Sequence, residues 1–125
     1  MSNQTLPTLV LGATTNPGRY AYLAVHSLME YGHEVIPVGI KTGEVNGIPI
    51  HPVDLDWFPK VDTVTLYVGP ARQPQYYDWL VNLKPRRVIF NPGTENPELM
   101  RMLDKHQIES VVACTLVMLS TRQYA

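Results

Sequence analysis

The sequence predicts an α/β fold of one domain, in which a doubly wound, mainly parallel sheet of five strands carries helices on both faces. The first observation is that short apolar or β-branched runs alternate five times with helix-forming segments, which is typical of a parallel sheet with crossover helices. The second is size, because 125 residues, 45% of them hydrophobic, are enough for one buried core. We therefore expect a single domain over residues 1–125.

The first half of the chain predicts a strand, a helix and a second strand. The run LVL at residues 9–11 ends at Gly12, as a buried strand followed by a turn would. Apolar side chains at helical spacing predict a helix at residues 20–31, and Gly32 favours its end there. Because Pro37 cannot donate to a ladder, it is expected among the last residues of the second strand. The helical spacing rests on Tyr20, Leu23, Ala24, Leu28 and Tyr31, and the second strand is predicted at residues 34–38.

The second half continues the alternation after a turn-rich stretch. Glycines and prolines between residues 43 and 52 mark turns around a brief extended piece at 48–50, and one helical turn is expected at 55–58. Apolar and β-branched runs then predict three strands, and two amphipathic segments predict helices. The strands are expected at 63–68, 87–90 and 108–112 and the helices at 73–83 and 97–106, while the apolar run at 114–119 is left without an assignment.

Composition excludes several classes of protein. The formal net charge of −1 gives no overall attraction to nucleic acid or to an anionic membrane. A single cysteine, Cys114, rules out an intramolecular disulfide and a zinc site of the CxxC type. The N-terminal sequence lacks the features of a signal peptide, and no apolar run approaches the ~20 residues of a membrane span. We expect a cytoplasmic protein that binds neither nucleic acid nor a membrane.

The loops that follow the predicted strands are the candidate site. In open α/β sheets, ligands bind at the carboxyl ends of the strands. The first of these loops opens a helix, whose free N–H groups and positive dipole end favour an anion such as a phosphate. Thr14, Thr15 and Asn16 add short donors there, although Thr15 or Asn16 would also serve as an ordinary helix cap. The loops cover residues 12–20, 39–41, 69–72 and 91–95.

Two familiar nucleotide motifs are absent. Thr14 and Pro17 stand where GxGxxG would need its second and third glycines, and the spacing of a P-loop fails as well. After the second strand, Lys41 stands near the place where a dinucleotide site would have an acid for the ribose. A basic residue there suits a nucleotide with an additional phosphate. Coenzyme A (CoA) carries a 3′-phosphate on its ribose, and NADP is the competing ligand.

At these residues the sequence resembles the small bacterial CoA-binding protein family, which is related to the CoA-binding domain of the succinyl-CoA synthetase α subunit. The matching stretches are VLGATTNPGRYAYLAV, GHEVIPV, VDTVTLYVGPARQ, KPRRVIFNPGTENPEL and CTLVML, which together span nearly the whole chain. The most specific stretch is NPGTENPEL. The resemblance implies a Rossmann-like fold with CoA bound across the strand ends.

The resemblance also implies site residues. The first loop would hold the CoA phosphates, Lys41 would pair with a phosphate at the nucleotide end, and the later loops would contact the adenine and the pantetheine arm. The chain departs from the family after the second strand, where Val38-Gly39-Ile40 stands in place of V-N-P. The expected CoA-binding residues are Gly12, Ala13, Thr14, Thr15, Asn16, Pro17, Arg19, Tyr20, Val38, Lys41, Val68, Gly69, Pro70, Arg72, Asn91, Pro92 and Gly93.

Several residues allow both a functional and a structural interpretation. Arg19 and Arg72 open helices, where the dipole disfavours a cation, so a bound anion would compensate; otherwise they are surface arginines. Glu95 borders the crevice and either stabilises a helix dipole or acts in catalysis. Cys114 would form a mixed disulfide with CoA, or it is a buried inert thiol. Arg86 and Arg87 lie at the other end of the sheet and are interpreted as surface charges. The four histidines lack the local spacing of a metal site, and none is expected.

Three functions follow from these observations. The first is a CoA-binding or acyl-CoA-binding protein without catalysis of its own, because the chain is too short to include the catalytic domain of the related synthetases. The second is a small NADP-dependent oxidoreductase that uses the same cleft. The third is an interaction protein with a vestigial nucleotide cleft and an apolar patch near residues 114–119. A partner protein remains open under each of them.

Overall fold

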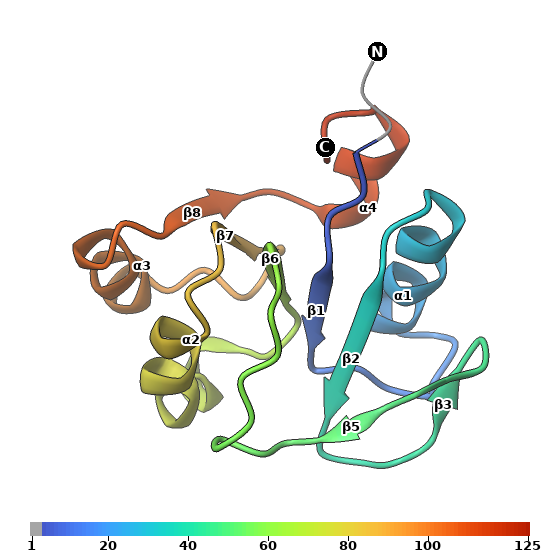
Figure 1. The fold of residues 1–125 in the computed structure, drawn as a ribbon, viewed down its shortest axis with the longest axis horizontal. Helices are drawn as coiled ribbons and strands as arrows, with labels where there is room; N and C mark the ends of the chain where they lie inside the picture. The colour runs from blue at the N-terminus through green and yellow to red at the C-terminus, as the bar shows by residue number, and fades with distance from the viewer. Residues whose placement is uncertain (1–3) are drawn as a thin grey trace.

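The fold was analysed in a computed structural model, which describes residues 4–125. Strands and helices alternate along the chain, as the sequence predicts, with a small hairpin inserted after the second strand (Figure 1). The strands are β1 (Thr8–Leu11), β2 (Val35–Gly39), β3 (Glu44–Val45), β4 (Ile48–Pro49), β5 (His51–Pro52), β6 (Thr63–Leu66), β7 (Arg87–Phe90) and β8 (Glu109–Val112). The α-helices are α1 (Tyr20–Glu30), α2 (Tyr77–Leu83), α3 (Pro97–Lys105) and α4 (Thr115–Ser120), and the 3₁₀ turns η1 (Pro70–Arg72) and η2 (Pro74–Tyr76) precede α2.

The main sheet is parallel throughout and has the order β5-β2-β1-β6-β7-β8. The chain winds from β1 outward to β2 and β5, then returns to pair β6 with the other side of β1, with Thr8 opposite both Val35 and Thr63. The winding therefore reverses between β1 and β6, which is where ligands bind in folds of this class. The sixth strand, β5, lies in the turn-rich stretch and pairs with only the last two residues of β2.

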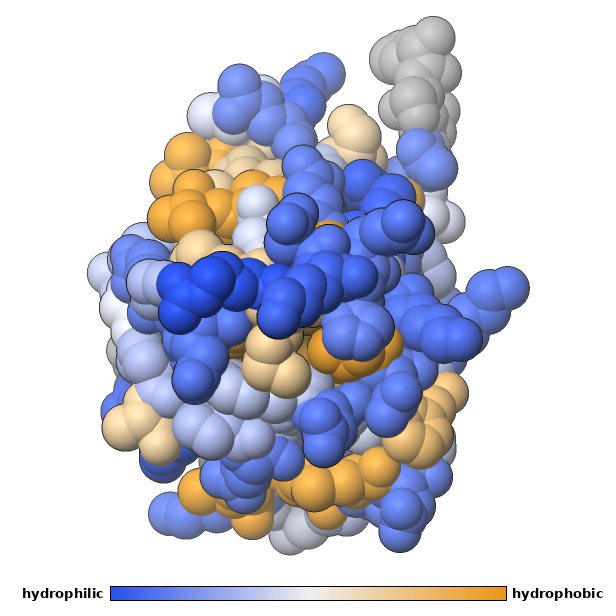
Figure 2. Space-filling model, turned by 90° about the vertical axis from the view of Figure 1, so that its left-hand side faces the viewer, coloured by the Kyte–Doolittle hydropathy of each residue, from blue (hydrophilic) through white to orange (hydrophobic). Residues whose placement is uncertain are grey.

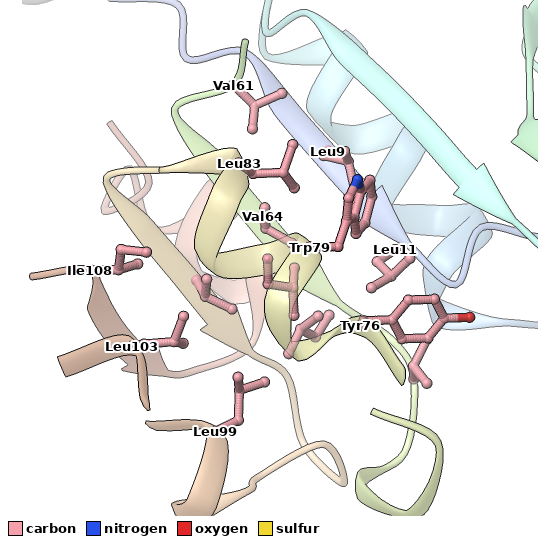
Figure 3. Close-up of a cluster of buried hydrophobic side chains, with 14 of the residues drawn as sticks. Leu9, Leu11, Val61, Val64, Tyr76, Trp79, Leu83, Leu99, Leu103 and Ile108 are labelled. Atoms are coloured by element: carbon pink, nitrogen blue, oxygen red, sulfur yellow. The ribbon is translucent and has the colours of Figure 1, made fainter. Parts of the chain in front are cut away.

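Helices cover both faces of the sheet and close two hydrophobic cores. On one face, α2 and α3 pack Trp79, Leu83, Leu99 and Leu103 onto strand residues such as Leu9, as seen in Figure 3. On the other face, α1 and α4 cover a second core. This second core includes Val10, Ala21, Val25, Leu28, Ile89, Met118 and Leu119. The predicted α/β, Rossmann-like fold is confirmed, although the sheet has six strands and not the five that were predicted.

Two details of the first half differ from the sequence prediction. Pro37 lies in the middle of β2, opposite Val10, and not among its last residues. The backbone carbonyl of Val38 points toward β1, so the backbone of Pro37, one residue earlier, points toward β5. Pairing of β2 with β5 begins only at Val38, so the missing N–H of Pro37 costs the sheet no hydrogen bond. In α1 the buried stripe includes Ala21 and Val25, whereas Tyr20, Leu23 and Tyr31 are exposed.

Arg87 is buried, and its interpretation as a surface charge is wrong. Its guanidinium donates to the hydroxyl of Thr63 at 2.9 Å and to the backbone carbonyl of Tyr124 at 2.6 Å, and it lies 4.6 Å from the centroid of the Tyr124 ring. Arg86 is exposed and pairs with Asp62 at 2.9 Å. The buried guanidinium thus ties the C-terminal segment to the amino ends of β6 and β7.

The surface is mostly hydrophilic on the side where α2 and α3 lie. Figure 2 shows apolar side chains there as separate patches, near the top and the bottom of the view. Within residues 4–125, no helix combines the length and the apolarity that a membrane crossing requires.

Candidate functional site

The loops after β1, β2, β6 and β7 all lie at the carboxyl edge of the sheet, and glycines let the first three approach closely. A Cβ on Gly12, whose φ is +100°, would lie 3.0 Å from the carbonyl oxygen of Tyr67. A Cβ on Gly39 would lie 2.3 Å from the carbonyl oxygen of Ala13, and one on Gly43 would lie 2.5 Å from the methyl group of Thr15. The backbone N–H groups of Gly12 and Ala13 both donate to the carbonyl of Val38 at 2.9 Å. The loop after β1 is therefore held against both neighbours at the reversal point.

The loop between β1 and α1 is held in shape by its own side chains. The Thr14 hydroxyl accepts from the N–H of Asn16 at 3.1 Å, and the Asn16 side-chain oxygen accepts from the N–H of Gly18 at 2.9 Å. A turn over Pro17 is closed by the N–H of Arg19, which donates to the carbonyl of Asn16 at 3.1 Å.

The N-terminus of α1 has no side-chain cap. Arg19 holds the N-cap position with an extended backbone, and no side chain within residues 4–125 caps the helix. Neither Thr15 nor Asn16 is thus the cap that their residue types would suit. The first-turn N–H groups at Tyr20 and Ala21 keep their positive end directed at the carboxyl edge, which favours an anionic ligand there.

Arg19, Lys41 and Arg72 bring positive charge to the loops after β1, β2 and β6. All three side chains are exposed, and within the described chain none pairs with a carboxylate. Arg72 lies at the end of η1, so it does not open an α-helix as expected. These charges remain available to an anion that lies along the edge.

The loop after β6 is fixed by Gln73, which the sequence analysis did not identify as important. Gln73 is fully buried; its amide donates to the carbonyls of Val68 and Thr94 at 2.9 and 2.8 Å, and its side-chain oxygen accepts from Asn96 at 2.9 Å. Gln73 thereby joins the loops after β6 and β7. Its spacing to Tyr76, Leu80 and Leu83 repeats the buried stripe, and this spacing was the signal that it would be buried. Val68 is buried, whereas Gly69 and Pro70 reach the surface.

The loop after β7 directs its first side chain inward. Asn91 is buried; its amide donates to the hydroxyl of Thr65 and the carbonyl of Leu66, and its side-chain oxygen accepts from the N–H of Thr115. The side chain of Asn91 therefore holds β6, β7 and the start of α4 together and does not face the edge. Pro92 and Gly93 are the exposed residues of this loop.

Glu95 closes the loop after β7. Gly93 has φ of +91°, and its N–H donates to a carboxylate oxygen of Glu95 at 2.8 Å. Glu95 is exposed, and Glu98 nearby accepts from the hydroxyl of Tyr77 at 2.8 Å. The β7 end of the site thus carries negative charge.

Tyr20 and Cys114 occupy different positions at this edge. Tyr20 is 72% exposed at the start of α1, beside the loop that precedes it, and so is available to a ligand. Cys114 is half-buried at the N-cap of α4, near the Tyr67 hydroxyl. Burial raises the pKa of Tyr67 to about 12, so this phenol stays neutral.

Two hollows lie elsewhere, at the amino edge of the sheet. One, of about 320 Å³, lies between the ends of α2 and α3, and the other, of about 430 Å³, lies beside the end of α1 and the start of β2. Neither is lined by an expected CoA-binding residue. We locate the candidate site by the converging loops and their charges, because a ligand laid across strand ends needs an open groove and not an enclosed cavity.

Comparison with known families and structures gives consistent results. A family model described as a CoA binding domain matches residues 7–120. A crystal structure of an uncharacterized protein is 51% identical, with a TM-score of 0.93 over 97% of this chain and 99% of that one. A comparison with curated proteins found no significant match.

More distant structures have the same fold. A protein from Thermus thermophilus is 26% identical, with a TM-score of 0.84 over 96% of this chain and 91% of that one. A dinucleotide-forming acetyl-coenzyme A synthetase from Ca. Korarchaeum cryptofilum is 20% identical, with a TM-score of 0.70, and the match covers 86% of this chain but 25% of the synthetase. At that identity the likeness concerns the fold alone.

Proposed function

Since the chain belongs to the family of CoA-binding domains, we propose that it binds CoA or an acyl-CoA across the carboxyl ends of its strands, without catalysis of its own. The phosphates would lie on the loop between β1 and α1. The observation that carries the proposal is the uncapped N-terminus of α1, held at the reversal point by a loop of fixed shape.

The cations support this arrangement of the ligand. CoA carries all its negative charge at one end, on a diphosphate and a 3′-phosphate. Arg19 stands beside the first-turn N–H groups of α1, and Lys41 follows β2, the next strand outward. We assign the diphosphate to the loop with Arg19 and the 3′-phosphate to Lys41. Tyr20, Val68, Gly69 and Pro70 would contact the adenine or the start of the pantetheine arm.

The arm would then cross β6 toward β7. Adjacent strands are ~4.8 Å apart, so an extended pantetheine is long enough to pass two of them. The backbone of Pro92 and Gly93 is the surface it would meet there. Because the Asn91 side chain is used inside the protein, Asn91 would contribute through its backbone at most.

Calorimetric titration of the nucleotide-stripped protein tests the proposal. CoA should bind more tightly than dephospho-CoA. Lys41→Ala should weaken CoA about five- to tenfold and leave dephospho-CoA nearly unchanged, because a single exposed charge contributes about 1 kcal/mol. Lys60→Ala, an exposed lysine that precedes β6, is the control and should change neither affinity.

The other outcomes distinguish the remaining functions. If NADP binds and CoA does not, the NADP-dependent oxidoreductase becomes the better hypothesis. If neither binds, the cleft is vestigial and an interaction protein is favoured. If Lys41→Ala weakens CoA and dephospho-CoA equally, the assignment of the 3′-phosphate to Lys41 is wrong.

A further inference from the structure

The carboxyl edge changes its charge from one side to the other. On the side of β2, β1 and β6 it carries Lys41, Arg19 and Arg72, whereas the β7 loop carries Glu95, followed by Glu98 on the first turn of α3. The nearest base on α3, Arg101, comes a full turn after Pro97, on the way to the amino edge. A ligand that is anionic at one end and neutral at the other matches this gradient in only one orientation.

A backbone donor at the β7 end is already occupied by a carboxylate of the protein itself. Gly93 is an exposed residue of this loop, and the carboxylate of Glu95 accepts from its N–H at 2.8 Å. An incoming carboxylate would have to displace that of Glu95 and then lie beside it. A neutral methyl or thiol group would meet no such competition. We propose that the negative charge of Glu95 disfavours acyl groups that end in a carboxylate, so that the site binds free CoA and neutral acyl-CoA esters more tightly.

This inference rests on the proposed function, since it assumes that the phosphates lie at the cationic side. It assigns Glu95 a role in specificity in place of the catalytic role considered from the sequence. Glu95 acts through the charge it presents to the end of the ligand, and no bond is made or broken.

A matched pair of ligands provides the test. Butyryl-CoA and succinyl-CoA have acyl chains of the same carbon number and differ in a terminal methyl against a carboxylate. By calorimetry at low salt, the wild type should bind butyryl-CoA about five- to tenfold more tightly than succinyl-CoA, as expected for one close pair of like charges near a surface. The ratio should shrink as salt is added.

Glu95→Gln is the decisive variant. It removes the charge and keeps a side-chain oxygen that can accept from the N–H of Gly93, so the loop should keep its shape. The ratio should fall to about one in this variant. Glu98→Gln is the control, because it removes a neighbouring charge whose carboxylate binds the hydroxyl of Tyr77 and not the N–H of Gly93. Its ratio should fall much less than that of Glu95→Gln.

The outcomes are separable. If no CoA compound binds, the proposed function fails and this inference fails with it. If free CoA binds but butyryl-CoA and succinyl-CoA bind equally, the inference alone is overturned. A ratio that persists in Glu95→Gln overturns it too, because the discrimination would then come from another group.

Discussion

At the scale of single residues, the glycines of the carboxyl edge determine how closely the loops approach. Gly39 is the tightest, since its missing side chain leaves room for the carbonyl of Ala13. In this chain the backbone carbonyl of Ala13 occupies the space that a Cβ at position 39 would fill.

Gly39→Ala should destabilise the protein and weaken CoA binding. A Cβ placed 2.3 Å from a backbone oxygen forces the loops apart, and overpacking of this kind costs ~1–3 kcal/mol. Urea denaturation measures the loss. Gly69→Ala is the matched control, because nothing lies within 4 Å of its Cβ position and its φ of −66° suits alanine. Equal stability of the two variants would contradict the close approach.

At the scale of elements, Gln73 connects the loops after β6 and β7 and the start of α3. Both of its amide hydrogens and its side-chain oxygen are used, and the side chain is fully buried. Removing one partner of such a buried network leaves the others unsatisfied.

Gln73→Glu should destabilise the protein by roughly 2–4 kcal/mol at neutral pH. The shape is nearly unchanged, but a carboxylate cannot donate to the carbonyls of Val68 and Thr94, and its charge is buried. Gln75→Glu, at an exposed neighbouring position, should change stability little. Thermal and urea unfolding of both variants measures the difference, and a mild effect at position 73 would show that the network contributes little.

The elements also determine how far the sequence could predict this structure. Short apolar or β-branched runs correctly predict β1, β2, β6, β7 and β8. The first four of these strands are mostly buried, whereas β8 lies at the edge of the sheet and is partly exposed. Periodicity cannot predict β5, since two residues have no period and their pairing depends on β2. It also leaves α4 unassigned, because six mostly apolar residues do not distinguish a helix from a strand.

The site was predictable in its position and less so in its side chains. That loops gather at the carboxyl edge follows from the order of the strands. That Asn91 turns inward depends on the hydroxyl of Thr65 and the N–H of Thr115, which come from two other elements. Likewise, burial of Arg87 depends on the last residues of the chain folding back over it.

At the scale of the whole molecule, both ends of the described chain meet at the amino edge. The N–H of Leu6 donates to Nδ1 of His33 at 2.9 Å, the His33 ring lies 4.9 Å from that of Tyr124, and the Tyr124 hydroxyl is 2.5 Å from that of Thr8. Burial, with the charge of Arg87, lowers the pKa of His33 below its ordinary 6.5. His33 is therefore neutral where it accepts from Leu6.

Stability should fall in mild acid because of His33. Its pKa is lower folded than unfolded, so the unfolded chain binds the proton more readily, and stability is lost as the pH falls below about 6.5. Melting temperatures between about pH 8 and pH 5 measure this. In His33→Gln, which keeps an acceptor for Leu6 but does not titrate, the loss should be smaller. His106→Gln, on the exposed end of α3, should behave as the wild type does, and identical curves for all three proteins would contradict this role of His33.

The strictly parallel sheet also bears on how the chain folds. Every pair in it joins strands separated by a crossover, with Thr8 opposite Val35 and Thr63, so no two of its strands can associate as a local hairpin. The antiparallel hairpin of β3 with β4 stands outside that sheet. The entropy cost of closing these long loops must therefore be met before most hydrogen bonds of the sheet form, which slows folding. Kinetic refolding should thus be slow relative to that of helical bundles of this length, and the central β1 amides, paired on both sides, should be among the last to exchange with deuterium.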